Sequence, residues 1–150
     1  MKPLIVLLSS FVIALFALYG IEHHWEWMLA GNISMSVMLL FTAIGHFALK
    51  ESMAKMLPPS IPYRHQIILV TGFLEMLGAI GLVITPTRTL TAVVLLVFFV
   101  LILPANIYAT TQKLNHETGA NDGPGLKYLW FRIPLQLLFI LWITYFSLLF

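Results

Sequence analysis

Glu75 is an isolated carboxylic acid within a long apolar stretch, in the sequence GFLEMLGAIGL (residues 72–82). The apolar run extends from Ile67 to Ile84, which places Glu75 about 12 Å from either end of a helix rising 1.5 Å per residue. An ionisable group at that depth of a bilayer costs about 2.5–3.5 kcal/mol, so we expect it to face polar partners inside the protein. Such a group can exchange a proton or bind a ligand. The alternative is a protonated acid whose hydrogen bonds only hold helices together.

Four further polar side chains are expected to converge on the same half of the protein. His46 and Asn106 each lie about one turn before the end of an apolar run, and Arg132 lies about one turn inside another. Gln136, one turn beyond Arg132, reaches the depth of Glu75, so that a network of Glu75, Gln136 and Arg132 is predicted. We expect a polar pocket that opens to the cytoplasmic half, where His46 and Arg132 orient a head group and Asn106 adds amide contacts.

Each of these residues also has a purely structural interpretation. Arg132 would extend its side chain to lipid phosphates, and Asn106 would bond backbone carbonyls freed by Pro104. His46 alone would be an interfacial histidine. The small or polar residues Thr71, Gly72, Gly78 and Ala79 lie within about 60° of Glu75 on a helix surface, where they allow close approach of another helix or leave room for a ligand.

Several other kinds of chemistry find no support in the sequence. The chain has no cysteine, which excludes disulfides and thiolate chemistry in this chain. We interpret the adjacent His23 and His24 as part of a solvated loop rather than a metal site, and the seven methionines as packing residues. No nucleophilic triad, phosphate-binding glycine loop or zinc-protease motif is present, and no basic cluster suggests nucleic-acid binding.

The composition places the chain in a membrane. Hydrophobic residues make up 60% of the 150 residues and charged residues only 9%. A water-soluble fold could not cover that much apolar surface. Apolar runs long enough to cross a bilayer of about 30 Å predict an all-α, polytopic transmembrane bundle of about five spans forming one domain over residues 1–150. The predicted spans are Leu4–Ile21, Met28–Leu49, Ile67–Ile84, Leu90–Ala109 and Tyr128–Phe150.

The first span has a rival interpretation, because Lys2 followed by an apolar stretch also describes a secretory signal peptide. Its apolar part exceeds the usual 7–15 residues of such a signal. Residues 17–20 form a poor cleavage site, because the bulky Tyr19 stands where a small residue is needed. We therefore expect a retained helix.

The distribution of cations predicts a multi-pass protein with its N-terminus in the cytoplasm and its C-terminus outside. Arg88 is the one cation that falls on the outer side. The cations on the cytoplasmic side are Lys2, Lys50, Lys55, Arg64, Lys113, Lys127 and Arg132. Residues 50–57 are expected to lie along the interface before Pro58 and Pro59, and residues 115–125 to form a mobile, solvent-facing loop. Residues 22–27 and a short turn at Thr85–Arg88 would lie outside. Aromatic residues near the predicted span ends support these boundaries: Trp25, Trp27, Tyr63, Tyr128 and Trp130.

An ordered set of motifs resembles the DoxX-like family of small bacterial integral membrane proteins. The motifs are AIGHF (residues 43–47), LPPSIP (57–62), GFLEMLGAIGL (72–82) followed by Pro86 and Arg88, and PANIY (104–108). The resemblance covers residues 28–150 as a four-helix core, and residues 1–27 form an additional N-terminal helix and external loop. It implies a bacterial cytoplasmic-membrane (plasma-membrane) location and a link to quinone-coupled sulfur oxidation or to membrane oxidoreductase complexes that handle thiol stress.

Three functions remain open at this point. The first is an integral membrane protein that binds a quinone-like or other lipophilic small molecule in the intramembrane polar pocket and supports a membrane oxidoreductase. The second is a small proton-coupled transporter or permeability factor. The lack of an evident inverted repeat counts against this function. The third is a non-catalytic assembly or scaffold subunit. A homodimer or an oxidoreductase partner is compatible with each, and the sequence leaves catalysis undecided.

Overall fold

The computed structural model describes residues 2–115 and 117–149, and every regular element within them is helical. Five helical segments are long and apolar enough to span a membrane. They are α1 (Lys2–Glu22), α2 (Trp27–Ala48), α4 (Arg64–Val83), α5 (Thr85–Thr111) and a continuous segment, Gly125–Leu148, made of the 3-10 helix η1 (Gly125–Tyr128), α6 (Leu129–Ile143) and the π-helix η2 (Thr144–Leu148). The short α3 (Lys50–Ala54) lies between α2 and α4. The predicted all-α bundle of about five spans is confirmed.

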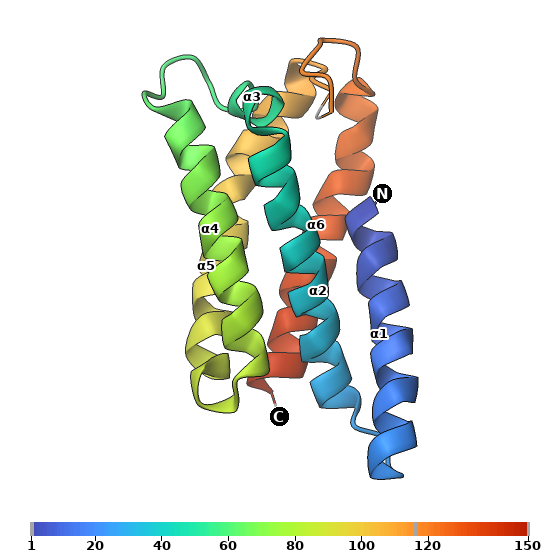
Figure 1. The fold of residues 1–150 in the computed structure, drawn as a ribbon. Coiled ribbons are helices and arrows are strands. Elements are labelled where there is room, and N and C mark those ends of the chain that lie inside the picture. The colour runs from blue at the N-terminus through green and yellow to red at the C-terminus, as the bar shows by residue number, and fades with distance from the viewer. Residues whose placement is uncertain (1, 116, 150) are drawn as a thin grey trace.

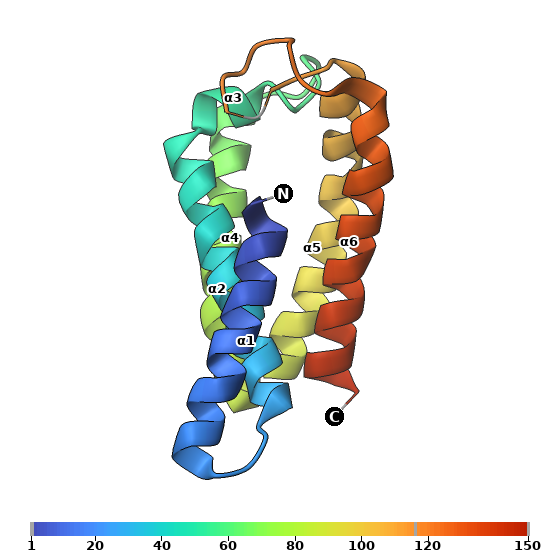
Figure 2. The ribbon, with the colours of Figure 1, turned by 90° about the vertical axis from the view of Figure 1, so that its right-hand side faces the viewer.

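Four long helices, α2, α4, α5 and α6, form the body of the molecule, and α1 packs along the outside of α2 (Figure 1). Figure 2 shows the α2–α4 pair on one side of the bundle and the α5–α6 pair on the other. The end at which α3 and the loop between α5 and α6 lie is called the α3 end below. The N-terminus points towards this end and the C-terminus lies at the opposite one.

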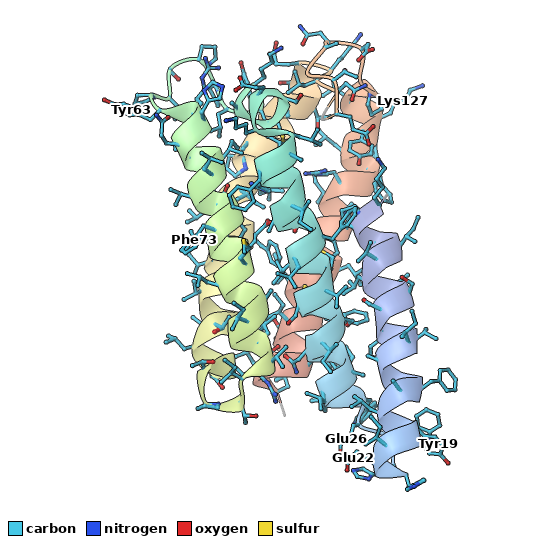
Figure 3. The ribbon with its side chains drawn as sticks, viewed as in Figure 1. Tyr19, Glu22, Glu26, Tyr63, Phe73 and Lys127 are labelled. Atoms are coloured by element: carbon cyan, nitrogen blue, oxygen red, sulfur yellow. The ribbon has the colours of Figure 1, made fainter. Side chains whose placement is uncertain are left out.

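The core is apolar and draws on all five long segments. Leu7 of α1, Met35 and Leu39 of α2, Leu82 of α4 and Ile143 of α6 are almost completely buried. The outward faces are equally apolar, as a bilayer requires: the large exposed side chains include Ile13, Phe73, Ile80, Leu101 and Leu141. Labelled side chains such as Phe73 point away from the bundle (Figure 3).

The connection between α4 and α5 is tighter than predicted, because the turn expected at Thr85–Arg88 is the first turn of α5 instead. The chain reverses at Ile84, and Pro86 occupies a first-turn position where its missing N–H has no helical partner to lose. Arg88 Nε donates to the Leu82 carbonyl at 2.9 Å, and the Thr87 hydroxyl donates to the Gly81 carbonyl at 3.0 Å. These bonds satisfy carbonyls at the end of α4, so the first turn of α5 takes the place of a separate connecting turn.

Two glycines define the register between α4 and α5. A Cβ atom added at Gly78 would lie 2.8 Å from Leu95, and one added at Gly81 would lie 2.2 Å from Thr91. Residue numbers therefore fall along α4 as they rise along α5. Three residues before Gly78 and three after Leu95, Glu75 of α4 lies at the same depth as Phe98 of α5. Asn106 follows Phe98 by two helical turns, and at 1.5 Å per residue it lies about 12 Å nearer the α3 end than Glu75 does.

The α3 end is closed by contacts between loops. Residues 50–57, which are expected to lie along the membrane interface, contain the five-residue helix α3. The loop predicted over residues 115–125 lies against it: the Ser52 hydroxyl donates to the Glu117 carbonyl at 3.2 Å, and Lys55 Nζ donates to the Gly119 carbonyl at 3.1 Å. The Glu117 carboxylate pairs with Lys2 of α1. The mobility of this loop stays a prediction.

Candidate functional site

Glu75 is buried inside the bundle, as predicted, and it lies against α2. Only 4% of its surface is exposed, and Oε1 lies 3.6 Å from Nε2 of His46. The Thr42 side chain lies near the carboxyl group, and its hydroxyl is also within hydrogen-bond distance of the Met38 and Leu39 carbonyls. The other oxygen, Oε2, is buried and has no hydrogen-bond partner among the described residues. Buried polar atoms are normally satisfied, so this oxygen has the capacity for one further hydrogen bond.

Gly72 allows α2 and α4 to come close enough for this contact. A Cβ atom on Gly72 would lie only 2.7 Å from the Cβ of His46, which is closer than side-chain carbons approach. Glycine is therefore required one helical turn before Glu75, and the small-residue face predicted around the acid serves helix packing at this position.

The surroundings of His46 determine how its protons can be arranged. Nδ1 lies 3.1 Å from the Ile68 carbonyl and 3.0 Å from the Thr71 hydroxyl, which itself lies 2.8 Å from the same carbonyl. A carbonyl only accepts, so the contact with Ile68 favours the tautomer with a hydrogen on Nδ1. Nε2, which faces Glu75, then either accepts a proton from a carboxylic acid or donates one to a carboxylate. In either arrangement the two side chains share one proton, and their distance of 3.6 Å is longer than a hydrogen bond but too short for another group to lie between them.

Asn106 and Arg132 form a second pair, between α5 and α6. Arg132 Nη2 donates to Asn106 Oδ1 at 2.7 Å, and Asn106 is 4% exposed. The alternative in which Asn106 bonds carbonyls freed by Pro104 is not observed, because its amide Nδ2 has no hydrogen-bond partner among the described residues. This pair therefore has a buried donor to offer.

Gln136 lies at the depth predicted for it but bonds elsewhere. Its Nε2 donates to the Phe99 carbonyl at 2.8 Å, and Phe99 adjoins the residue level with Glu75. The hydrogen bonds and ion pairs of the described residues join His46 to Glu75 and Asn106 to Arg132, but they do not link the two pairs through Gln136. The five predicted residues thus form two pairs and one separate interhelical bond rather than one network.

No described groove coincides with the predicted polar pocket. One shallow groove is lined by Leu4 and residues of α6, and another by Leu96, Val97, Val100 and Leu101 of α5. Both are apolar, and neither is lined by any of the five predicted site residues.

A fourth polar group, which we did not predict, lies at the opposite end of the bundle. The Asn32 side chain is fully buried; its Nδ2 donates to the Met28 and Phe146 carbonyls, both at 2.8 Å, and its Oδ1 accepts from the Ser147 hydroxyl at 2.7 Å. The acceptor Phe146 lies in the π-helix η2, whose widened turn offers carbonyls to other donors. An amide within an apolar run was the signal in the sequence. Both polar atoms of the Asn32 side chain have hydrogen-bond partners, which indicates a structural role.

The loop between α1 and α2 carries the adjacent histidines. His24 Nδ1 lies 2.8 Å from the Glu22 carbonyl, and its Nε2 pairs with the Glu26 carboxylate. These two hydrogen bonds, that to the backbone first, raise the pKa of His24 above its usual 6.5. The loop thus holds a histidine whose charge is stabilised by its own neighbours.

The fold and these pairs define a multi-pass helical membrane protein with an acid–imidazole pair inside the bundle. Residues 35–147, more than half of the chain, match the family described as "Domain of unknown function (DUF8561)", and the chain belongs to that family. The matched region includes both polar pairs and leaves α1 outside. No curated protein and no solved structure matches the chain.

Proposed function

We propose that this protein binds a quinone-like or other lipophilic small molecule at the Glu75–His46 pair and supports a membrane oxidoreductase system. The observation that carries the proposal is the buried Glu75 Oε2, which has no partner among the described residues while Oε1 faces His46 Nε2. An apolar molecule bearing a carbonyl or hydroxyl group supplies the missing hydrogen bond and enters from the bilayer without crossing water.

The pair suits a ligand whose oxygen changes its protonation. The carboxylic acid form of Glu75 donates a hydrogen bond to a carbonyl oxygen, and the carboxylate form accepts one from a hydroxyl group. His46 holds the second site for the same proton, so the pair can give a proton to the ligand or take one from it. Electrons for a quinone would come from a partner oxidoreductase, because this chain has no cysteine for dithiol chemistry.

The DoxX-like resemblance of the motifs around His46, Glu75 and Asn106 supports this assignment. It favours a bacterial cytoplasmic membrane, with the α3 end in the cytoplasm as the cation distribution predicts. A homodimer or an oxidoreductase subunit would then be the partner in the membrane. These assignments rest on the sequence and belong to the proposal.

A scaffold function is the second candidate, and the satisfied interhelical bonds favour it. Gln136 bonds the Phe99 carbonyl and Asn32 bonds Ser147 and the Phe146 carbonyl, so polar residues do hold helices together elsewhere in this bundle. In that case Glu75 would affect stability alone.

Quinone binding to the protein in native-lipid particles separates the two functions. The probe is a benzoquinone with a single isoprene unit, and the variant is Glu75→Gln, which keeps the shape and removes the exchangeable proton. The matched control is Glu22→Gln, which makes the same change at an exposed position outside the bundle. We expect affinity to fall about tenfold in Glu75→Gln, as for one lost hydrogen bond, and to stay unchanged in the control.

Equal affinity in the three proteins, or no quinone binding by the wild type, would contradict the proposal. Lower thermal stability of Glu75→Gln without a change in affinity would support the scaffold function instead.

A further inference from the structure

Arg132 carries a charge that the described part of the protein does not neutralise. Its side chain is half-buried one turn inside α6, and none of the ion pairs among the described residues includes it. Its side-chain hydrogen-bond partner among residues 2–115 and 117–149 is Asn106 Oδ1, which is neutral. A guanidinium group inside a membrane normally has an anionic partner or water, so its further partner must come from outside the described residues.

Asn106 adds a second donor at the same place. Its Nδ2 is buried and has no hydrogen-bond partner in the described part of the chain, while its Oδ1 is occupied by Arg132. The pair therefore presents N–H groups from two helices and a positive charge, with the only strong acceptor already used. This donor set fits an anionic oxygen, and the planar guanidinium favours phosphate or carboxylate.

The surroundings favour the phosphate of a lipid. Asn106 lies about five residues from the end of α5, within about 8 Å of the α3 end of that helix, where lipid phosphates are found. Lys127 of η1, just before α6, points outwards in Figure 3 and adds a second positive charge at this end of the bundle. Cations near the membrane surface attract anionic lipids.

An apolar groove of about 200 Å³ extends along the same helix. It is lined by Leu4 of α1 and by Trp130, Phe131, Pro134, Leu135 and Leu138 of α6. Leu135, at one edge of the groove, lies about 60° around the helix from Arg132, so a molecule with its anionic group at Arg132 can reach the groove past Leu135.

We infer that Asn106 and Arg132 bind the phosphate of an anionic phospholipid in the leaflet at the α3 end, with an acyl chain in the groove between α1 and α6. This site is separate from the Glu75–His46 pair and does not depend on the function proposed for it. Two prolines, Pro104 before Asn106 and Pro134 after Arg132, flank the paired side chains in their helices.

The test is a titration of the purified full chain with phosphatidylglycerol, in which native mass spectrometry measures the bound lipid. The same titration is made with zwitterionic phosphatidylcholine, and a third arm adds excess inorganic phosphate to the phosphatidylglycerol complex. The variant is Arg132→Gln, and the control is Lys50→Gln, which removes the same charge from the exposed α3 end away from the groove.

We expect phosphatidylglycerol to bind the wild type and Lys50→Gln equally and Arg132→Gln at least about tenfold more weakly, as for a charge-assisted hydrogen bond. Phosphatidylcholine should bind more weakly than phosphatidylglycerol, and inorganic phosphate should not displace the lipid. If Arg132→Gln does not fold, Arg132→Lys takes its place, with an expected loss of about threefold or more because the two-pronged guanidinium is gone.

Three results would overturn the inference. The first is equal phosphatidylglycerol affinity in the wild type and in the folded Arg132 variant. The second is an equal loss in Lys50→Gln, which would indicate a general charge effect. The third is displacement of the lipid by inorganic phosphate, which would indicate a site for a free anion.

Discussion

Replacing Gly72 by alanine should disrupt the candidate site without touching a polar group. The new Cβ would lie 2.7 Å from the Cβ of His46, whereas non-bonded carbons are stable at about 3.5–4.0 Å. The two helices must therefore separate by about 1 Å at this level. The His46–Glu75 contact, already 3.6 Å long, would then exceed the range of a direct interaction.

The expected energy follows from two opposing effects. Overpacking of this kind costs about 1–3 kcal/mol, and alanine recovers up to about 1 kcal/mol of helix propensity relative to glycine. We expect a net destabilisation of about 1–2 kcal/mol together with about tenfold weaker quinone binding. Gly20→Ala is the matched control, because nothing lies within 4 Å of a Cβ at Gly20, and it should be neutral or slightly stabilising.

The assay combines thermal denaturation in lipid particles with the quinone titration on the same preparations. The reasoning would be refuted if Gly72→Ala were as stable as Gly20→Ala and kept the wild-type affinity. Destabilisation without a change in affinity would show that the helix contact is real but that the site does not depend on it.

Three further predictions concern other parts of the molecule. Asn32→Ala should lower stability by about 1–3 kcal/mol, since the Ser147 hydroxyl loses its acceptor and the Phe146 carbonyl its donor; an unchanged melting temperature would contradict this. Arg88→Ala should cost about 0.5–1.5 kcal/mol because the Leu82 carbonyl at the end of α4 loses its partner, with Arg64→Ala, at the start of α4, as a comparison by the same assay. His24 should titrate above pH 6.5 in NMR, and less so in Glu26→Gln; its raised pKa stabilises the fold below the unfolded-state pKa, and this contribution disappears as the pH rises through the folded-state pKa.

The helices were predictable because apolar runs of bilayer length leave little alternative to helix. The predicted and observed bounds of the second span, Met28–Leu49 against Trp27–Ala48, differ by one residue at each end. The connection at Ile84 was not predictable in the same way. Thr85–Arg88 has a turn-like composition, but Pro86 is also a good first-turn residue, and only the bonds to the Gly81 and Leu82 carbonyls decide between the two.

The candidate site was predictable in its members but not in its connections. Depth along each helix brought His46 to the same half of the bundle as Asn106, and it placed Gln136 level with Glu75. Depth says nothing about the direction of a side chain around the helix axis, so the partners were not determined. The packing at Gly72 decides that His46 meets Glu75, and the position of Arg132 beside Asn106 leaves Gln136 to bond the Phe99 carbonyl.

The most direct test of the central claim is an infrared difference spectrum of the protein with and without the short-chain benzoquinone. If the ligand contacts the Glu75 carboxyl, its binding must change the carboxyl stretching bands in the wild type and in Glu22→Gln, and this change must be absent from Glu75→Gln. The same carboxyl change in Glu75→Gln would show that the ligand acts elsewhere, and the proposed site would be wrong.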